Sequence, residues 1–294
     1  AMNHVMWSNP ATQANREVLE ERGIHILGPG IGSQACGETG AGRMLEPAAI
    51  AAAVFSLTGG KGDGRLEGRK VVITAGPTRE AIDPVRYITN RSSGKMGYAL
   101  ASAAAAQGAD VVLISGPVSI ANPAGIDVID VESAEQMYAA THEIIGDADI
   151  FIAAAAVADY RPANAVDRKI KKNDESMSLE LVRCPDILAS IAALETAPFT
   201  VGFAAETNNV IEYARGKLEK KKLDLIVANR VGVDCGFDRD DNTATALWRN
   251  GEKSFPTCSK IDLARDLIEL IAEHFYAVRG ADTHPRLTVI SNSD

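Results

Sequence analysis

Apolar and polar positions alternate in blocks along most of the chain. From Lys70 onward, short continuous apolar runs are separated by longer segments whose apolar residues repeat at helical spacing. The apolar runs that we expect to be buried strands are 71–74, 111–114, 128–131, 150–157, 199–204 and 225–228. The helices expected between them are 97–107, 133–145, 185–194 and 208–222. This alternation predicts an α/β fold with a doubly wound, mostly parallel (Rossmann-like) sheet flanked by helices and joined by right-handed crossovers.

The pattern changes at both ends of this region. After Asn229, residues 243–248 alternate in polarity, as does the segment around Phe255, which predicts antiparallel strands before a last helix from Ser259 to about Tyr276. Before Lys70 we expect a helix at 10–22, a strand at 24–27, a glycine-rich loop at 28–43 and a helix at 45–55. These first elements are too few to enclose a core of their own.

We therefore divide the chain into four parts. A truncated fragment covers 1–58, a linker rich in glycine and charge covers 59–66, the main domain covers 67–278, and a flexible tail without periodicity covers 279–294. Because the sequence begins Ala1-Met2-Asn3 inside a motif, we interpret it as a piece of a longer protein.

Composition excludes several classes of protein. The 294 residues carry a net charge of −9, which argues against broad binding to nucleic acid or to an anionic membrane. The four cysteines form no CxxC pair and the five histidines show no ligand spacing, so a zinc site or disulfide framework is not expected. No apolar run approaches the roughly 20 residues that span a bilayer. We expect a cytoplasmic protein without membrane or nucleic-acid partners.

The connection after the first strand, residues 74–97, is unusually long and polar. It ends in small residues just before a helix, where free backbone N–H groups can face an anion. A Walker loop would need glycine at Thr89 and serine or threonine at Met96, and the GxGxxG fingerprint is also absent. An ordinary surface loop is the alternative interpretation.

Two further segments follow predicted strands. In AAAAVADYR (153–161), small residues let a base or sugar approach the backbone, and Asp159 suits a ribose hydroxyl or a phosphate-bound Mg²⁺, although it could equally cap a turn. In RKIKK (168–172), four cations in five residues suit a triphosphate, against the alternative of a solvated charge run.

The helix at 208–222 places Lys217 and Lys221 on one face, where they either close over phosphates or complement the helix C-terminus. Pro185 and Asp186 open another helix and are candidate ligand contacts. Cys184, just before them, is expected to be a small buried residue and not a nucleophile.

Together these pieces carry a specific resemblance. The runs ITAGPTREAIDPVRYITNRSSGKMG, AAAVADYR, KIKK, CPDIL, GFAAETNN and LDLIVANRV closely resemble bacterial phosphopantothenoylcysteine synthetase over about 66–276. Upstream, MNHVMWSNPATQAN and ACGETGAGRM resemble the end of phosphopantothenoylcysteine decarboxylase, a flavodoxin-like flavin enzyme. In many bacteria the two activities are fused in one polypeptide.

The resemblance implies a ligase of coenzyme A biosynthesis that joins 4′-phosphopantothenate to L-cysteine at the expense of CTP. The carboxylate attacks the α-phosphate of CTP, pyrophosphate leaves, and the cysteine amine then displaces CMP from the acyl-cytidylate. The fused parent protein would also decarboxylate the product to 4′-phosphopantetheine.

The family's site residues carry over by position. Lys169 matches the lysine needed to form the acyl-cytidylate, Asn90 the asparagine that holds this intermediate, and Arg86 a residue supporting the second half-reaction. Asp159 is the candidate protein ligand of Mg²⁺. The resemblance implies CTP contacts at Ala153, Ala154, Ala155, Asp159, Lys169, Pro185, Asp186, Ile187, Leu188, Phe203, Lys217 and Lys221.

The resemblance also bears on partners. Asn3 and Cys36 match the decarboxylase's substrate-site asparagine and flap cysteine, but the flavin-binding half is missing, so neither FMN nor decarboxylation is expected here. The family enzyme is a homodimer, LDLIVANRV resembles its dimerisation region, and the chain after Asn229 is expected to pair the protomers. A larger assembly is implied for the full-length protein with its decarboxylase domain.

Two functions from other classes remain as alternatives. A Rossmann-type oxidoreductase is disfavoured by the missing glycine fingerprint. A catalytically silent scaffolding subunit would have no need of Lys169, Asn90 and Asp159 together. The sequence gives no physical reason for CTP over ATP.

Overall fold

The computed structural model describes residues 2–34, 37–47, 49–50, 53–54, 64–171, 176–206, 208–230 and 241–280. The chain forms two compact units, Ala1–Gly60 and Lys61–Asp294, and each is described by itself. The division falls in the stretch 59–66 where a linker was expected. Residues 59–63 of that stretch, the expected tail beyond Gly280, and Cys36 lie outside the described residues.

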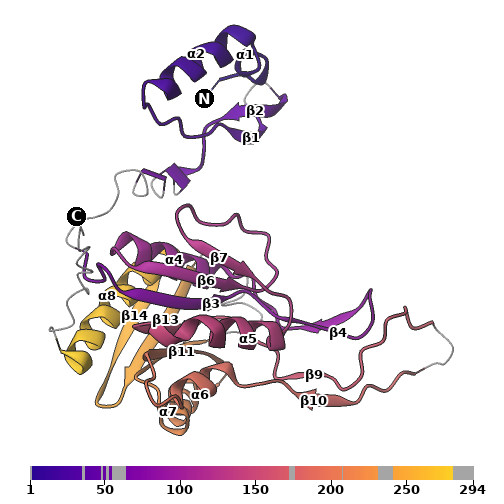
Figure 1. Cartoon of the computed structure of the whole chain (residues 1–294), viewed down its shortest axis with the longest axis vertical. Helices are drawn as coiled ribbons and strands as arrows, with labels where there is room; N and C mark the ends of the chain where they lie inside the picture. Colours follow the sequence, from indigo (N-terminus) through magenta and orange to yellow (C-terminus); the bar gives the residue numbers. More distant parts are fainter. Residues whose placement is uncertain are drawn as a thin grey trace, which may run out of the picture. The chain divides into compact units, whose positions relative to one another are not determined.

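Among its described residues, the first unit contains helices α1 (His4–Trp7) and α2 (Pro10–Glu21), a hairpin of β1 (Gly30–Ser33) and β2 (Thr39–Arg43), and further helical residues within 47–54 (Figure 1). The prediction of α2 is confirmed. The predicted strand at 24–27 is wrong, because this stretch is irregular and Ile24 and Leu27 are exposed. Of the expected helix at 45–55, the described residues 47, 49–50 and 53–54 are helical.

The β1–β2 hairpin lies in segment 28–43, which was predicted to be a loop. Two glycines explain how β2 can pack there. A Cβ at Gly40 would lie 2.7 Å from the Cβ of His4. Gly42 has a φ of +137°, and a Cβ there would meet the carbonyl oxygen of Met2 at 2.2 Å. The two glycines therefore let β2 lie directly against the start of the chain, although their β propensity is low.

An eight-stranded sheet forms the centre of the second unit, in the order β14-β13-β12-β11-β8-β3-β6-β7. The strands are β3 (Lys70–Ala75), β6 (Asp110–Ser115), β7 (Asp127–Asp130), β8 (Ile150–Ala153), β11 (Phe199–Glu206), β12 (Leu225–Arg230), β13 (Asp241–Trp248) and β14 (Gly251–Ser259). The first six are parallel, and β13 and β14 add an antiparallel extension beside β12. The predicted doubly wound sheet is confirmed. Its order reverses between β3 and β8, the point at which such sheets bind ligands.

Helices cover both faces of this sheet (Figure 1). They are α4 (Lys95–Ala106), α5 (Ala134–Ile144) with the 3₁₀ turn η1 (Ile145–Asp147), α6 (Ile187–Ala192), α7 (Val210–Lys221) and α8 (Lys260–Arg279). Alternate residues of β3 serve the two faces: Val71 and Ile73 pack with α4 and α8, and Val72 packs with α5 and α6. Burial on both faces explains why the parallel strands are continuous apolar runs.

The helix starts follow the local sequence. Ser133 and Gln136 form the predicted capping box of α5, and the hydroxyl of Ser259 accepts a hydrogen bond from the N–H of Asp262 at the start of α8. Among the described helices, none is both long enough and apolar enough to cross a bilayer.

Two hairpins that the sequence analysis did not predict extend from the carboxyl edge of the sheet (Figure 1). β4 (Arg79–Ala81) pairs with β5 (Tyr87–Thr89), and β9 (Tyr160–Pro162) pairs with β10 (Leu181–Arg183). We call the described residues 79–89, 160–171 and 176–183 the arm. The first hairpin accounts for the length of the connection after β3. The strand β8 ends at Ala153, four residues earlier than predicted, because the chain then turns toward β9.

Candidate functional site

The loops that follow β3 and β8 are joined to each other at the point where the strand order reverses. The N–H of Ala154 donates to the carbonyl oxygen of Thr74 (3.1 Å) and that of Ala156 to the carbonyl oxygen of Gly76 (2.8 Å). Pro77 and Ala156 form an isolated parallel bridge. We call these loops, together with the ends of β11, α6 and α7 beside them, the rim.

Two polar side chains of the β3 connection reach the β8 loop. The hydroxyl oxygen of Thr78, which is buried, accepts from the N–H of Ala158 at 3.0 Å. The amide nitrogen of Asn90 donates to the carbonyl oxygen of Val157 at 2.9 Å. Asn90 is exposed, so the structure places this predicted catalytic residue at the rim with its amide fixed to the neighbouring loop.

The start of α4 lies against the end of β3. A Cβ at Gly97 would lie 2.4 Å from the Cβ of Ala75, so only glycine lets helix and strand approach this closely. Gly94, at the N-cap, has a φ of +77° and no side chain with which to cap the helix. The first turn therefore has the geometry expected for binding an anion through backbone N–H groups.

The residues predicted to contact a nucleotide gather around the neighbouring strand ends. Ala153 pairs with Gly202 on β11, one residue before Phe203, and the loop residues Ala154 and Ala155 follow it. A Cβ at Gly202 would meet Leu188 of α6 at 2.8 Å, so this helix packs closely on the strand. Phe203 is half-buried against the main core cluster.

The two predicted lysines of α7 reach carboxylates at this edge. Lys221 Nζ lies 2.9 Å from Asp186 Oδ1, and Lys217 Nζ lies 2.7 Å from Glu206 Oε1 at the end of β11. Asp186 caps α6 by accepting from the N–H of Ala189, after Pro185 and before the buried Ile187. The structure therefore brings this predicted set together and directs both ammonium groups to the rim.

The Asp186 carboxylate is held in its ionised form. Burial works against ionisation, but the hydrogen bonds from Lys221 and from the N–H of Ala189 outweigh it, and the pKa of Asp186 is lowered. A bound triphosphate would compete with this carboxylate and with Glu206 for the same two ammonium groups.

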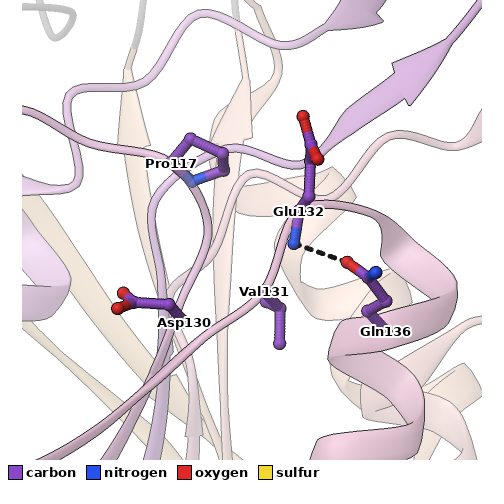
Figure 2. Close-up of a pocket in the computed structure, with 5 residues that line it drawn as sticks. All are labelled: Pro117, Asp130, Val131, Glu132 and Gln136. Atoms are coloured by element: carbon purple, nitrogen blue, oxygen red, sulfur yellow. Dashed lines mark hydrogen bonds between the residues drawn. The ribbon is translucent and has the colours of Figure 1, made fainter.

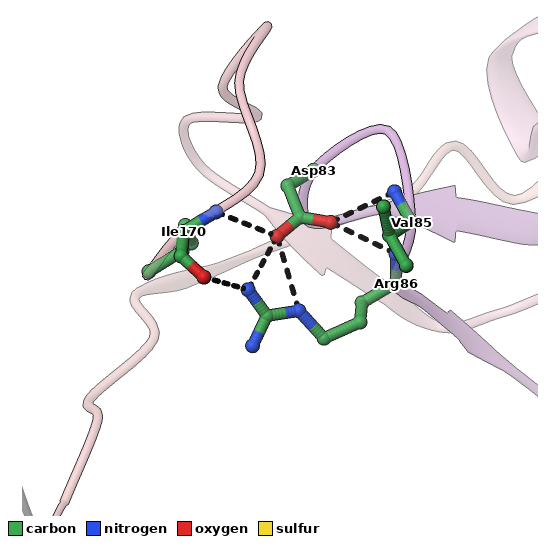
Figure 3. Close-up of polar contacts among 4 residues, drawn as sticks. All are labelled: Asp83, Val85, Arg86 and Ile170. Atoms are coloured by element: carbon green, nitrogen blue, oxygen red, sulfur yellow. Dashed lines mark hydrogen bonds and ion pairs between the residues drawn. The ribbon is translucent and has the colours of Figure 1, made fainter. Parts of the chain in front are cut away.

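Two further predicted site residues, Arg86 and Lys169, lie on the arm. Arg86 donates from Nε (3.0 Å) and Nη2 (2.5 Å) to Oδ2 of Asp83, and from Nη2 to the carbonyl oxygen of Ile170 (2.8 Å) (Figure 3). Lys169 immediately precedes Ile170 and is exposed. Lys172, the last lysine of the run, lies outside the described residues.

Asp159 lies where the β8 loop enters the arm. Its side chain is exposed, and its carbonyl oxygen accepts from the N–H of Cys184 at 2.9 Å. Among the described residues, no group of three or more His, Cys, Asp or Glu side chains is arranged to hold a metal ion. In this part of the chain, Asp159 is therefore a single oxygen donor and not a member of a protein-built metal site.

Cys184 has the chemistry of a structural thiol. Burial and, to a smaller extent, the negative charge of Glu80 together raise its pKa to about 11. The thiol is protonated at neutral pH and is a weak nucleophile.

A hollow at the ends of β6 and β7 contains none of the predicted site residues (Figure 2). Pro117, Asp130, Val131, Glu132 and Gln136 line it, and the N–H of Glu132 donates to the side-chain oxygen of Gln136 at 2.7 Å. Its two carboxylates make it unsuitable for a triphosphate. The rim is a better candidate for nucleotide chemistry.

In the first unit, Asn3 has a structural role. Its side-chain oxygen accepts from the N–H of Val5 at 2.8 Å and caps α1, and its nitrogen donates to Glu38 at 2.8 Å. Cys36, its predicted counterpart, lies outside the described residues.

The comparisons with known proteins agree with the fold. Residues 66–275 match the family model described as the DNA/pantothenate metabolism flavoprotein C-terminal domain, and residues 1–59 match the flavoprotein family. The chain therefore belongs to the DNA/pantothenate metabolism flavoprotein family. It is 54% identical over 275 residues to the coenzyme A biosynthesis bifunctional protein CoaBC of Vibrio vulnificus (strain YJ016), covering 92% of this chain and 68% of the relative.

Solved structures have the same fold as this chain. The crystal structure of the C-terminal domain of a CoaBC protein matches with a TM-score of 0.63 and 38% identity, covering 73% of this chain and 99% of that one. A Cab2 mutant in complex with phosphopantothenate-cysteine matches at 15% identity with a TM-score of 0.59, covering 80% of this chain and 97% of that one. At this identity the second likeness concerns the fold alone.

Three residues of this region were missed at the sequence level: Thr78, Asp83 and Glu206. Asp83 precedes a proline, and an Asp-Pro pair is a turn signal that could have indicated its place in the β4–β5 turn. Nothing in the spacing links Asp83 to Ile170 or Glu206 to Lys217, since these contacts depend on the tertiary fold.

Proposed function

We propose that this chain is a phosphopantothenate–cysteine ligase of coenzyme A biosynthesis, which forms 4′-phosphopantothenoyl-L-cysteine from 4′-phosphopantothenate, L-cysteine and CTP. The observation that carries the proposal is the gathering of the small Ala153 loop, Phe203 and the lysines Lys217 and Lys221 around adjacent strand ends. Small residues admit a base and sugar, and the lysines face the charge of a triphosphate. CoaBC relatives, named for coenzyme A biosynthesis, support the same assignment.

The proposed mechanism assigns different tasks to the rim and the arm. The substrate carboxylate attacks the α-phosphate of CTP and pyrophosphate leaves, while the Lys169 ammonium neutralises the charge that builds on the α-phosphate. The cysteine amine then attacks the acyl-cytidylate and releases CMP. Asn90, tied through its nitrogen to Val157, presents its amide oxygen as a hydrogen-bond acceptor for that amine.

Mg²⁺ fits this site as a companion of the nucleotide. A bound Mg²⁺ would offset triphosphate charge, with oxygen ligands supplied mainly by phosphates and water. The exposed carboxylate of Asp159 is the protein ligand that we propose. FMN binding and decarboxylation to 4′-phosphopantetheine are proposed only for a protein that also carries a flavin-binding half.

The active unit that we propose is a cytoplasmic homodimer. The strand β12, which contains most of the expected dimerisation motif, pairs with β11 and β13 of its own chain, so its edges are occupied. The arm, in contrast, exposes a set of large apolar side chains: Val85, Tyr87, Tyr160, Val166, Met177, Leu179 and Leu181. We propose that protomers meet through this surface of the arm and through the strands after Asn229, of which β14 lies at the edge of the sheet.

A pyrophosphate assay tests the proposal. We expect pyrophosphate release that requires both 4′-phosphopantothenate and CTP, and amide formation that further requires L-cysteine. A silent scaffolding subunit would release none, and an oxidoreductase would instead reduce or oxidise a nicotinamide cofactor. Parallel assays with CTP and with ATP identify the nucleotide substrate. Pyrophosphate release with ATP but not with CTP would contradict the CTP assignment.

Replacing Asn90 separates the two half-reactions. In Asn90→Asp the amide donor to Val157 is lost and a negative charge faces the intermediate. We expect pyrophosphate release close to that of the wild type but amide formation reduced about 100-fold, the effect of losing one positioning contact. Quenched single-turnover reactions would detect accumulated acyl-cytidylate. Equal loss of both products would show that Asn90 does not act in the second step.

A further inference from the structure

Asp83 is a buried charge whose hydrogen bonds join two distant segments of the arm. Its side chain is 0% exposed. Oδ1 accepts from the N–H groups of Val85 (2.8 Å) and Arg86 (2.9 Å), and Oδ2 accepts from the Arg86 guanidinium and from the N–H of Ile170 (3.1 Å). A buried carboxylate is tolerated only when it is paired and hydrogen-bonded, so this geometry is strongly determined.

The ionised form of this carboxylate is strongly favoured. The hydrogen bond from Arg86 lowers the pKa of Asp83 well below its usual range; burial works against this, and the N–H groups of Val85 and Ile170 add to the lowering. Asp83 is consequently an acceptor for all of its donors throughout the pH range in which an enzyme of this kind works.

Both backbone polar groups of Ile170 are bonded to this pair of side chains (Figure 3). Its N–H donates to Asp83, and its carbonyl oxygen accepts from Nη2 of Arg86 at 2.8 Å. A backbone hydrogen bond from the N–H of Val166 to the carbonyl oxygen of Ile82 (3.2 Å) fixes the same segment four residues earlier. The lysine run is therefore attached to the β4–β5 turn at two points.

We propose that Asp83 and Arg86 form a clamp that positions Lys169. This inference rests on the proposed function, because it names the residues that fix the position of Lys169, the lysine of the first half-reaction. The N–H of Ile170 belongs to the peptide unit shared with Lys169 and its C=O to the unit shared with Lys171, so both units are fixed, and Ile170 is half-buried while Lys169 and Lys171 are exposed. The clamp thus holds the backbone and leaves the lysine side chain free to reach a phosphate.

The clamp also changes the task of Arg86. The resemblance assigns Arg86 to the second half-reaction, whereas its guanidinium here is bonded to Asp83 and Ile170. As a positioning residue for Lys169, Arg86 must affect the first half-reaction as well, and its effect must depend on Asp83.

Asp83→Asn tests this directly. In either orientation of the new side chain its amide nitrogen would face donors, namely the guanidinium and the N–H of Ile170 at one position or the N–H groups of Val85 and Arg86 at the other. We expect faster hydrogen–deuterium exchange in the peptide that contains Ile170, and pyrophosphate release in a single turnover slowed about 10- to 100-fold, since small misplacement of a reacting group has effects of this size. The dissociation constant for CTP should change less than about threefold, because the rim is untouched.

Matched variants complete the experiment. Asp147→Asn removes the carboxylate that pairs with Lys70, and Arg265→Gln removes a guanidinium that pairs with Asp262, both outside the arm and rim. We expect neither variant to alter exchange at Ile170 or pyrophosphate release. Arg86→Lys keeps the charge but loses the bidentate contact, so it should change exchange at Ile170 and pyrophosphate release as Asp83→Asn does. Pyrophosphate release by the double variant should be no slower than that of the slower single variant.

The outcomes separate this inference from the proposed function. Faster exchange together with slower pyrophosphate release, in a protein with wild-type circular dichroism, supports the clamp. Unchanged exchange, or faster exchange with unchanged release, overturns it. A wild-type protein that releases no pyrophosphate would instead refute the proposed function. If Asp83→Asn does not fold, Arg86→Lys provides the same two readings.

Discussion

The rim and the arm build their parts of the site in different ways. At the rim, adjacent strands and loops are joined by backbone hydrogen bonds, and glycines such as Gly97 and Gly202 bring helices into contact with strand ends. On the arm, the lysine run has no strand at 168–171 and is attached through the side chains of Asp83 and Arg86. In the proposed function, the sheet would therefore supply shape complementarity to the nucleotide, and a separately fixed segment would supply the charge needed for reaction.

The largest effect that we expect follows the loss of the arm's charge. Lys169→Gln preserves the length and polarity of the side chain but removes the ammonium group, so charge on the α-phosphate is no longer neutralised. We expect pyrophosphate release to fall by about 100- to 1,000-fold, with little change in CTP affinity if the rim alone holds the nucleotide. Single-turnover kinetics and equilibrium titration with CTP measure the two quantities.

A control lysine sharpens this result. Lys253, on β14, lies over the ring of Phe255 and outside both regions, and Lys253→Gln should leave pyrophosphate release unchanged. Normal release by Lys169→Gln would mean that the arm does not supply the reacting charge, and the division of tasks between arm and rim would be wrong.

The sequence predicted the sheet and its flanking helices well because these elements are periodic. The six parallel strands, the capping box of α5 and the start of α8 each depend on local residues, and all are confirmed. The placement of Asn90 beside the β8 loop and of Lys221 beside Asp186 follows from the rule that ligands bind beyond the carboxyl ends of parallel strands.

The arm was not predicted because its strands are short and depend on tertiary contacts. Three-residue strands such as β4 and β9 give no period that can be detected. The buried Asp83 joins residues 87 positions apart, which no local pattern shows. The error at 24–27 has a similar cause, since an apolar run forms a strand only where a partner strand is present.

A smaller effect is expected from adding a methyl group where α4 contacts the end of β3. In Gly97→Ala the new Cβ would lie 2.4 Å from the Cβ of Ala75, so α4 must move away from β3. We expect a loss of about 1–3 kcal/mol in the free energy of unfolding, the usual effect of overpacking. For a domain of this size each kcal/mol lowers Tm by about 2–4 °C, which thermal denaturation followed by circular dichroism will measure.

Gly216→Ala is the matched control for this change. Gly216 lies on the exposed face of α7 with no atom within 4 Å of an added Cβ, so alanine should stabilise the protein by about 0.5–1 kcal/mol. If both variants shift Tm in the same direction, close packing at Gly97 is not what fixes the rim.

The smallest expected effect concerns Cys184, where the arm joins the rim. Its N–H donates to the carbonyl oxygen of Asp159, and burial raises the pKa of its thiol to about 11. At pH 8 only about one thiol in a thousand is then ionised, so alkylation by iodoacetamide should be roughly 100-fold slower in the folded protein than in urea. The rate should rise with pH until the thiol ionises near pH 11.

Mass spectrometry of the labelled peptides measures this rate beside that of Cys258, whose pKa burial also raises. Labelling of Cys184 in the folded protein as fast as in urea would mean that the junction opens and that the arm moves independently of the rim. Slow labelling that Asp83→Asn leaves unchanged would show that the clamp orders the lysine run while the base of the arm is held by the rim. The two attachments would then be separate, one made by backbone at the sheet and one made by side chains on the arm.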